Sequence, residues 1–256
     1  MIKAAFFDLD GTLLSHRTKG VPQSTLLALE KLRSAGVLCV LATGRQIQEI
    51  GKLPVSDLRF DSCITLNGQL ILDDCGQVVY DVPITGKARE YLLKLFSEHT
   101  IPILMVQKEN AYLNFVDSRV EFVQRAISSA IPPLGEYREG EIYQACAYLG
   151  PGDEAVLAPI QGECVMTRWA VGGLDIIAKG GGKVSGIRRY LQETGIRPEE
   201  TIAFGDGEND IGMLSFAGIG VAMGNAEPEV KAAADYVTAD IDDDGIYKAL
   251  QHLQLL

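Results

Sequence analysis

The sequence predicts an α/β protein whose parallel-sheet core receives an inserted α+β unit. Two observations carry this prediction. Short apolar runs of strand length alternate with helical segments at both ends of the chain, and such alternation is typical of a parallel sheet with crossover helices. Between residues 83 and 180 the rhythm changes to a helix followed by paired strands, which is typical of an antiparallel α+β unit.

The N-terminal part begins with an apolar strand over residues 3–7. Pro22 opens a helix that ends near Gly36 and carries leucines at helical spacing. A continuous apolar run over 37–42 follows, as expected for a strand that is buried on both faces. A further helix is expected to begin at residues 43–45. The remaining strands of this part are predicted over 63–66, 70–72 and 78–80, the last two as a hairpin.

The middle of the chain, residues 83–180, is predicted to be a separate cap unit, so that the core consists of 1–82 together with 181–256. Insertions of this kind are tolerated in exposed loops, where they disturb the core least. Helices are predicted over 88–96 and 120–129. Strands are predicted over 103–106, 112–116, 142–149, 165–170 and 174–178.

Alternation of strands and helices resumes in the C-terminal part. Helices are predicted over 184–194, 210–216, 228–233 and 246–253. Strands are predicted over 201–204, 219–222 and 236–238. We expect these strands to join the N-terminal ones in a single sheet.

The composition excludes some classes of protein. The chain has 256 residues, of which 47% are hydrophobic and 22% charged, and this composition is ordinary for a globular protein rather than a disordered one. The 23 Lys and Arg residues against 34 Asp and Glu residues give a net charge of −11. Binding to nucleic acid or to an anionic membrane through a general positive field is therefore not expected.

No segment is expected to direct the chain into a membrane. The longest uncharged apolar run, residues 37–42, is too short to span a bilayer. The apolar N-terminus meets Asp8 and Asp10 at once, unlike a signal peptide. The five cysteines form no CxxC pair and are expected to be buried free thiols. We therefore expect a cytoplasmic location.

Two carboxylates, Asp8 and Asp10, follow the first strand. Residues two apart on a strand project to the same side, while Leu9 points into the core. Open α/β sheets bind their ligands at this edge. Because two close carboxylates repel, a divalent cation such as Mg²⁺ would stabilise the pair, and carboxylate oxygens suit it. The alternative is a solvated acidic turn.

A second acidic motif, Gly205-Asp206-Gly207-Glu208-Asn209-Asp210, follows another predicted strand. Asp206 and Asp210 are four residues apart, so they share one face if a helix starts between them. A simple helix N-cap is the alternative. That alternative accounts for one acidic side chain but not for the whole polar group behind an apolar strand.

Two further motifs suit an anion. Thr43-Gly44-Arg45 follows the second strand, and a hydroxyl with a backbone N–H at a helix N-terminus can bind an anion, although Thr-Gly is also an ordinary turn. Lys183 begins a predicted helix, where a cation opposes the helix dipole. A nearby carboxylate cluster or phosphate would explain this position, and a surface lysine is the alternative.

Taken together and in this order, these motifs resemble those of the haloacid dehalogenase-like hydrolase superfamily. The matching stretches read DLDGTLL, ATGR and GDGENDIGML, and the insertion precedes the lysine motif. This arrangement is similar to that of the Cof-type (subfamily IIB) phosphatases. The resemblance covers the whole chain and implies a Rossmann-like core with an inserted α+β cap of the C2 type.

The resemblance implies a site for phosphoryl transfer. Asp8 would attack phosphorus and form an aspartyl-phosphate, and Asp10 would serve as general acid and base. The residues that would bind the transferring phosphate are Thr43, Gly44 and Lys183.

A Mg²⁺ cofactor is also implied. Its ligands would come from Asp8, Asp206 and the backbone carbonyl of Asp10. Asp210 would complete the acidic set and, with Asn209, position Lys183 or a metal-bound water.

Further residues are candidates for contact with the substrate, namely Arg45, Asn67, Asp175 and Asn209. The segment before Lys183 departs from the family pattern. Relatives often have a proline between an acidic residue and the lysine motif, whereas here isoleucines follow Asp175. We expect this departure to affect the substrate and the cap rather than the chemistry.

The expected function is that of a Mg²⁺-dependent phosphatase acting on small phosphorylated metabolites, such as sugar phosphates or related monoesters. The expected partner is the small substrate alone, without nucleic acid or membrane, and the sequence indicates no oligomeric state. One alternative is a phosphomutase that uses the same intermediate. Another is a catalytically silent module that binds a phosphorylated metabolite.

Overall fold

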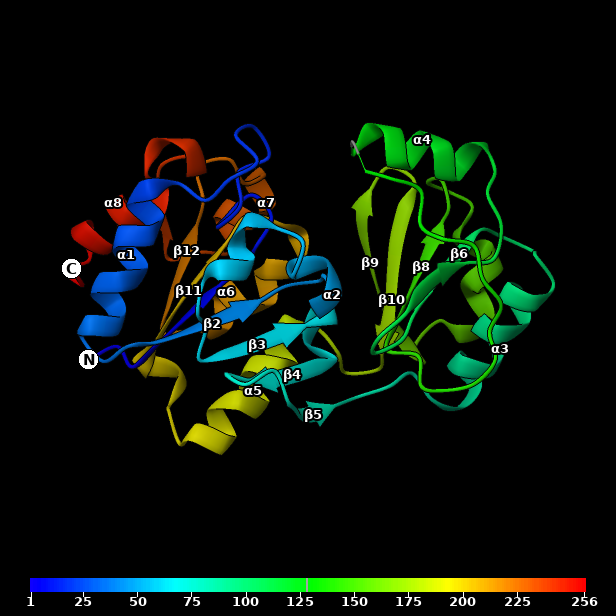
Figure 1. The fold of residues 1–256 in the computed structure, drawn as a ribbon, viewed down its shortest axis with the longest axis horizontal. Coiled ribbons are helices and arrows are strands. Elements are labelled where there is room, and N and C mark those ends of the chain that lie inside the picture. Colours follow the sequence, from blue (N-terminus) through cyan, green and yellow to red (C-terminus); the bar gives the residue numbers. More distant parts are fainter. Residues whose placement is uncertain (128) are drawn as a thin grey trace. The chain divides into compact units, whose positions relative to one another are not determined.

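The computed structural model describes residues 1–127 and 129–256, and the chain divides into two compact units (Figure 1). Met1–Asp81 and Gly182–Leu256 form the first unit, and Val82–Gly181 form the second. Each of these boundaries lies within one residue of the boundary expected from the change in the pattern of predicted strands and helices.

The first unit contains an eight-stranded sheet in the order β13-β12-β11-β1-β2-β3-β4-β5. Pairing is parallel from β13 to β3, and β4 and β5 continue the sheet as an antiparallel hairpin. β1 pairs with both β2 and β11, so strands from both ends of the chain form one sheet, as the sequence predicts. The strands are β1 (Ala4–Phe7), β2 (Leu38–Ala42), β3 (Ser62–Thr65), β4 (Leu70–Asp73), β5 (Val78–Asp81), β11 (Thr201–Gly205), β12 (Ile219–Ala222) and β13 (Tyr236–Val237).

Helices cover both faces of this sheet. Phe7 of β1 packs in the apolar core shared with α1 and α8, whereas Phe6 packs in the core shared with α5, α6 and α7. The two-residue period of a strand requires this alternation, and burial on both faces explains the continuous apolar runs. The helices are α1 (Gln23–Ser34), α5 (Lys183–Thr194), α6 (Ile211–Phe216), α7 (Pro228–Ala232) and α8 (Gly245–His252).

The second unit contains a five-stranded antiparallel sheet in the order β7-β6-β8-β10-β9. Ala145 and Ala147 of β8 pack in the core with α3 (Gly86–Ser97), and Cys146 and Tyr148 pack on the other face with α4 (Ser118–Ala126). The strands are β6 (Ile103–Val106), β7 (Ala111–Leu113), β8 (Gln144–Tyr148), β9 (Cys164–Ala170) and β10 (Gly173–Ala178). The α+β character predicted for this segment is thus confirmed.

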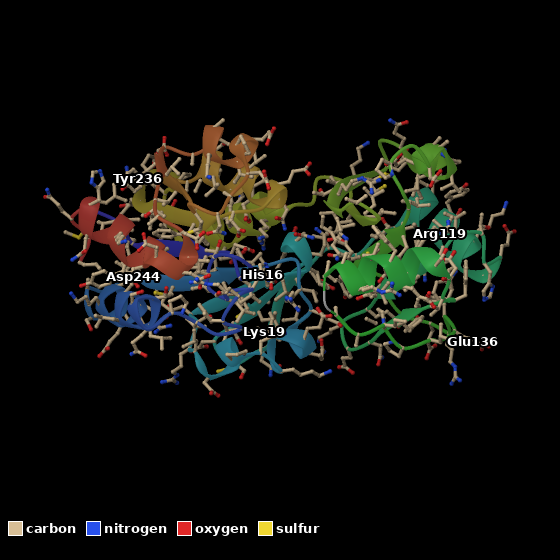
Figure 2. All side chains as sticks on the ribbon, turned by 90° about the horizontal axis from the view of Figure 1, so that it is seen from above. His16, Lys19, Arg119, Glu136, Tyr236 and Asp244 are labelled. Atoms are coloured by element: carbon tan, nitrogen blue, oxygen red, sulfur yellow. The ribbon has the colours of Figure 1, made fainter. Side chains whose placement is uncertain are left out.

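Short helical segments lie in the connections. The one α-helical segment among them, α2, covers Ile47–Ile50. The 3-10 segments are η1 (Pro54–Asp57), η2 (Leu66–Gly68), η3 (Glu154–Ile160), η4 (Pro198–Glu200), η5 (Glu208–Asp210) and η6 (Ile241–Asp243). The loop after β1 exposes His16 and Lys19 (Figure 2).

The prediction of a helix beginning at residues 43–45 is wrong, because α2 begins only at Ile47. The backbone of this segment is engaged elsewhere. The Thr43 carbonyl accepts from Asn67 N–H at 3.0 Å, and the Arg45 carbonyl accepts from Leu66 N–H at 3.2 Å. These bonds to the loop after β3 replace the first turn of a helix.

Other elements differ from the predictions in length or burial. α4 ends at Ala126, short of the predicted 129, and Ser128 lies outside the described residues. Cys75 is exposed in the turn between β4 and β5, so the prediction that every cysteine is buried is wrong. None of the helices in the described part of the chain has the length and hydropathy that crossing a bilayer requires.

Candidate active site

A buried lysine joins two carboxylates at the carboxyl ends of the parallel strands. Lys183 Nζ donates to Asp8 Oδ1 at 2.5 Å and to Asp210 Oδ1 at 2.7 Å. Asp8 follows β1, Asp210 follows β11, and Lys183 is the first residue of α5. The Lys183 side chain is 0% exposed, so its cationic position at a helix start is explained by the two carboxylates that it contacts.

The loop after β11 is organised by Asp210. Its Oδ2 atom accepts from the backbone N–H groups of Asp206 and Gly207, both at 2.9 Å. Its other oxygen accepts from Lys183. The side chain therefore holds the loop and the ammonium at once, which explains why an acidic residue is needed four positions after Asp206.

The loop after β1 contacts Asp206 directly. Thr12 Oγ1 donates to Asp206 Oδ1 at 2.9 Å. Gly11 has a φ of +82°, and a Cβ atom there would lie 2.1 Å from Asp206 Oδ2. Only glycine permits this approach, because it combines the left-handed conformation with the absence of a side chain.

Burial and repulsion dominate the electrostatics of this group. Burial raises the pKa of Asp8 well above its usual range, and Asp210 raises it further while Lys183 opposes the shift. Burial and the nearby Asp210 also raise the pKa of Asp206 to about 7. Burial lowers the pKa of Lys183, but the two carboxylates outweigh burial and raise it above the ordinary lysine value. The positive charge of the Lys183 ammonium is thus shared among several closely spaced carboxylates.

The acidic group fits a divalent cation. One oxygen each from Asp8, Asp206 and Asp210 lies within 4.8 Å of the others. These ligands are all carboxylate oxygens, the type that Mg²⁺ prefers. A single lysine leaves these carboxylates with excess negative charge, which a bound Mg²⁺ would balance.

The Asp10 side chain has a different partner. Arg45 donates to it through both Nε, at 2.6 Å from Oδ2, and Nη2, at 2.8 Å from Oδ1. This bidentate pair raises the pKa of Arg45, chiefly through the hydrogen bond to Asp10. Arg45, expected as a contact for the substrate, therefore engages a carboxylate of the protein.

The remaining candidates of the first unit gather around Asn67. Asn209 Nδ2 donates to Asn67 Oδ1 at 2.9 Å, and a Cβ atom on Gly44 would lie 3.1 Å from the Asn67 amide. The Thr43 hydroxyl accepts from Arg45 N–H at 3.1 Å, within a partly buried turn. Asp175 belongs to the second unit, where it lies on β10 opposite Cys146 and Thr167.

Two polar residues of this site were given no role from the sequence, although Thr12 lies within the DLDGTLL stretch. Thr12 binds Asp206, as described above. Asn225 Nδ2 donates to the Gly11 carbonyl at 2.9 Å and to Asp206 Oδ2 at 3.1 Å. Asn225 lies three residues after the end of β12, so a search for polar residues in the loops that follow buried strands would have included it.

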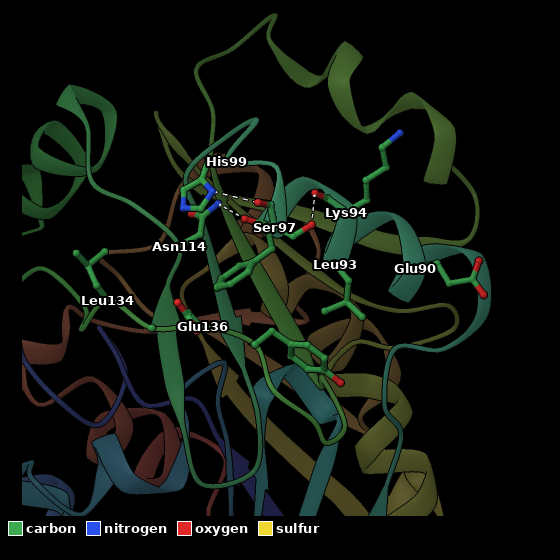
Figure 3. Close-up of a pocket in the computed structure, with 11 residues that line it drawn as sticks. Glu90, Leu93, Lys94, Ser97, His99, Asn114, Leu134 and Glu136 are labelled. Carbon is green, nitrogen blue, oxygen red and sulfur yellow. Dashed lines mark hydrogen bonds between the residues drawn. The ribbon is translucent and has the colours of Figure 1, made fainter.

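The second unit contains a cavity of about 890 Å³ beside α3 (Figure 3). Asn114, which lines it, donates to the carbonyls of Phe96 and Ile101 and accepts from Ile103 N–H. These bonds give Asn114 a structural role in joining β7 to its neighbours. The other lining residues are Glu90, Leu93, Lys94, Phe96, Ser97, His99, Leu134, Gly135, Glu136 and Tyr137.

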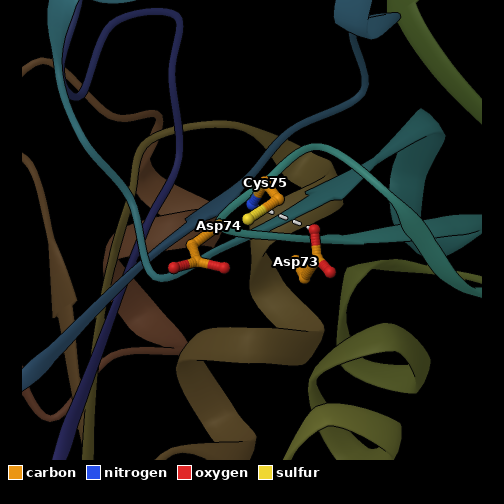
Figure 4. A group of neighbouring side chains, drawn as sticks. All are labelled: Asp73, Asp74 and Cys75. Carbon is orange, nitrogen blue, oxygen red and sulfur yellow. Dashed lines mark hydrogen bonds between the residues drawn. The ribbon is translucent and has the colours of Figure 1, made fainter.

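A second acidic group, Asp73, Asp74 and Cys75, lies in the turn between β4 and β5 (Figure 4). Asp73 Oδ1 accepts from the N–H groups of Cys75 at 3.0 Å and Gln77 at 2.8 Å. Asp73 therefore closes a hairpin turn.

The chain is similar to known proteins over its whole length. The family model of the haloacid dehalogenase-like hydrolases matches residues 5–250. YkrA of Bacillus subtilis (strain 168), a provisionally named phosphatase, is 33% identical, with 99% of this chain and 98% of YkrA covered.

Solved structures agree with this match. The phosphatase BT1666 from Bacteroides thetaiotaomicron superposes with a TM-score of 0.92 at 33% identity, covering 100% of this chain and 96% of that one. The subclass IIB sugar phosphatase BT4131 superposes with a TM-score of 0.86 at 36% identity, covering 99% and 100%. With the aspartate and lysine motifs gathered at one end of the sheet, the chain belongs to the haloacid dehalogenase-like hydrolase family.

Proposed function

We propose that this hydrolase is a Mg²⁺-dependent phosphatase that cleaves small phosphorylated metabolites, such as sugar phosphates, through a phosphorylated Asp8. The observation that carries the proposal is the buried contact of Lys183 with Asp8 and Asp210 beside Asp206. A carboxylate held against an ammonium, next to a cation site, is the arrangement that attack on a phosphate requires.

Asp8 acts as the nucleophile. One of its oxygens forms a bond to phosphorus while the bond from phosphorus to the ester oxygen breaks. Lys183 lowers the charge repulsion between this carboxylate and the phosphate dianion. Mg²⁺ held by Asp8, Asp206 and Asp210 would supply further positive charge at the same place.

Asp10 serves as the general acid and the general base. It donates one to the leaving ester oxygen, and it later accepts one from the water that attacks the phosphorylated Asp8. Arg45 holds both oxygens of Asp10 in this structure. Proton donation therefore requires that this ion pair opens and that Asp10 takes up a proton from solvent when the substrate binds, which frees a guanidinium beside Thr43 and Gly44.

Similarity to a solved structure supports the proposed class of substrate. BT4131, at 36% identity over nearly the whole chain, is a sugar phosphatase. A net charge of −11 makes a large polyanion an unsuitable partner, whereas a single phosphate needs only a local cation site. We therefore propose small phosphomonoesters as the substrates.

Phosphate release from a panel of sugar phosphates, nucleotides and pyridoxal phosphate, with Mg²⁺ and with EDTA, tests the proposal. We expect turnover that needs Mg²⁺ and is absent in Asp8→Asn, with an unchanged circular dichroism spectrum. Isomerised product in place of inorganic phosphate would identify a mutase instead. Tight binding of the panel without turnover would identify a binding module.

A further inference from the structure

The segment after β3 has an unusual backbone. Leu66, Asn67 and Gly68 have φ values of 51°, 53° and 88°, so three successive residues are left-handed. Glycine adopts this conformation freely and asparagine more readily than most residues, but leucine does not. Such a conformation persists only where the surroundings impose it. Here the imposing contacts come from the loops that carry the candidate active site.

One set of contacts fixes the start of α5. Gly182 N–H, immediately before Lys183, donates to the Asn67 carbonyl at 3.1 Å. A Cβ atom on Gly68 would lie 2.3 Å from the Gly182 carbonyl oxygen, and one on Gly186 would lie 3.0 Å from Gly68 Cα. The first turn of α5 thus packs against this segment backbone to backbone. The segment thereby determines where the Lys183 side chain begins.

A second set of contacts comes from the side chain of Asn67, a buried residue that is 4% exposed. Its Oδ1 atom accepts from Asn209 Nδ2 at 2.9 Å. Asn209 directly precedes Asp210, which binds Lys183 Nζ at 2.7 Å. The Asn67 amide also lies against Gly44. One residue therefore joins the loop after β2, the start of α5 and the loop after β11.

We propose that Asn67 is a positioning residue that sets the place of the Lys183 ammonium relative to Asp8 by tying these three loops together. The inference rests on the proposed function, since it concerns the groups that act in phosphoryl transfer. Catalysis of this kind depends on positioned charge, so a small displacement of the ammonium slows the reaction. The buried contact with Asn209 supports a role through other residues rather than through the substrate.

Two variants remove the hydrogen bond from opposite sides. Asn67→Gly keeps a residue that tolerates the left-handed backbone and deletes the whole side chain with its amide, and Asn209→Ala deletes the donor without touching that backbone. The probe is p-nitrophenyl phosphate with Mg²⁺, and kcat, KM and the thermal unfolding midpoint are measured for both variants and for the double variant. Asn110→Gly, in the exposed turn between β6 and β7, is the matched control.

We expect each single variant to lower kcat about tenfold while KM changes by less than about threefold. The double variant should be no slower than either single variant, because both substitutions remove one interaction. A merely structural role would lower the unfolding midpoint without moving kcat per folded molecule. If Asn67→Gly yields no folded protein, Asn209→Ala alone carries the test.

A kcat equal to that of the wild type in Asn209→Ala would overturn the inference. So would effects of the two substitutions that multiply, or a rise in KM alone, which would indicate a direct contact with the substrate. These outcomes leave the proposed function standing as long as the wild type turns over the probe and Asp8→Asn does not. Absence of turnover in the wild type would instead contradict the proposed function itself.

Discussion

Arg45 holds both carboxylate oxygens of Asp10, through Nε at 2.6 Å and Nη2 at 2.8 Å. A second Arg–Asp pair lies at the surface, where Arg17 contacts Asp242 Oδ2 through Nε at 2.8 Å and the Arg17 side chain is 72% exposed. The first pair involves the proposed acid and base, and the second does not. This contrast allows the two arginines to be compared by the same substitution.

Arg45→Lys keeps the positive charge but loses the planar group that binds two oxygens at once. We expect kcat for a phosphomonoester to fall by at least about tenfold, because lysine cannot offer the phosphate the planar two-donor group that Arg45 frees when its pair with Asp10 opens. Arg17→Lys should leave kcat unchanged. Steady-state kinetics of the two variants check this, and equal effects would refute a special role for the Arg45 pair.

Lys183→Met retains the apolar length of the side chain and removes the ammonium from Asp8 and Asp210. The free energy of unfolding in EDTA should fall by about 3–5 kcal/mol, because the carboxylates are left buried without a partner. Excess Mg²⁺ should restore part of this loss by binding the same carboxylates. Urea unfolding with EDTA and with Mg²⁺ measures both effects.

The control for this substitution is Lys248→Met, which removes an exposed pair with Asp243 at 2.8 Å. Its effect on unfolding should stay below about 1 kcal/mol. A Lys183→Met variant as stable as the wild type in EDTA would contradict the electrostatic account of the site.

Gly11→Ala tests the close approach of the loop after β1 to Asp206. The added Cβ atom would lie 2.1 Å from Asp206 Oδ2, so we expect weaker Mg²⁺ binding in calorimetry and a loss of stability. Gly76→Ala is the matched control, since Gly76 has a φ of +77° with nothing within 4 Å of the added atom. That control should lose about 1–2 kcal/mol for the left-handed conformation alone.

Both glycine variants could lose the same stability while Gly11→Ala binds Mg²⁺ as the wild type does. The close approach to Asp206 would then contribute neither to stability nor to Mg²⁺ binding. The expected excess for Gly11→Ala is about 1–3 kcal/mol, the usual effect of forcing an atom into a packed site.

Glu200 provides a prediction on pH. Hydrogen bonds from Lys3 and Arg197 lower its pKa from 4.5 to about 2. Because the folded pKa lies below the unfolded one, the stabilisation is complete above pH 4.5 and is lost as the pH falls toward 2. Glu200→Gln should therefore lower the urea midpoint at neutral pH, with a difference from the wild type that shrinks below pH 4.5.

Glu199→Gln makes the same change in charge at the neighbouring position and is the control for this pH series. Its difference from the wild type should be smaller than that of Glu200→Gln at neutral pH. A Glu200→Gln effect that stays constant down to acidic pH would show that the lost interaction is not the ionised carboxylate.

The strand and helix order was predictable because its signals are local. A strand buried on both faces, such as β2, must be apolar throughout, and this run is visible in the sequence without any partner. Asp8 and Asp206 were found for the same reason, since each directly follows such a strand. Even the change of rhythm near residue 83 agrees with the division into two units at Asp81 and Val82.

One prediction was wrong because a tertiary contact competes with local preference, and another because composition was considered without the local turn. Residues 43–45 look like the start of a helix, but the segment after β3 takes up the carbonyl groups of Thr43 and Arg45. Cys75 was expected to be buried on composition alone, whereas its place in a hairpin turn exposes it. The first outcome depends on a segment distant in the chain, whereas the second follows from a local turn that Asp73 closes.

By itself, the sequence determined the order of the elements, the inserted unit and the polar residues at the strand ends, because these depend on local hydrophobic periodicity. Only the tertiary structure decided which of those polar groups meet. Lys183 and Asp8 are separated by 175 positions, Arg45 takes Asp10 as its partner, and Asn67 joins Asn209. Such pairings depend on how the loops at one end of the sheet pack, and no local pattern encodes that packing.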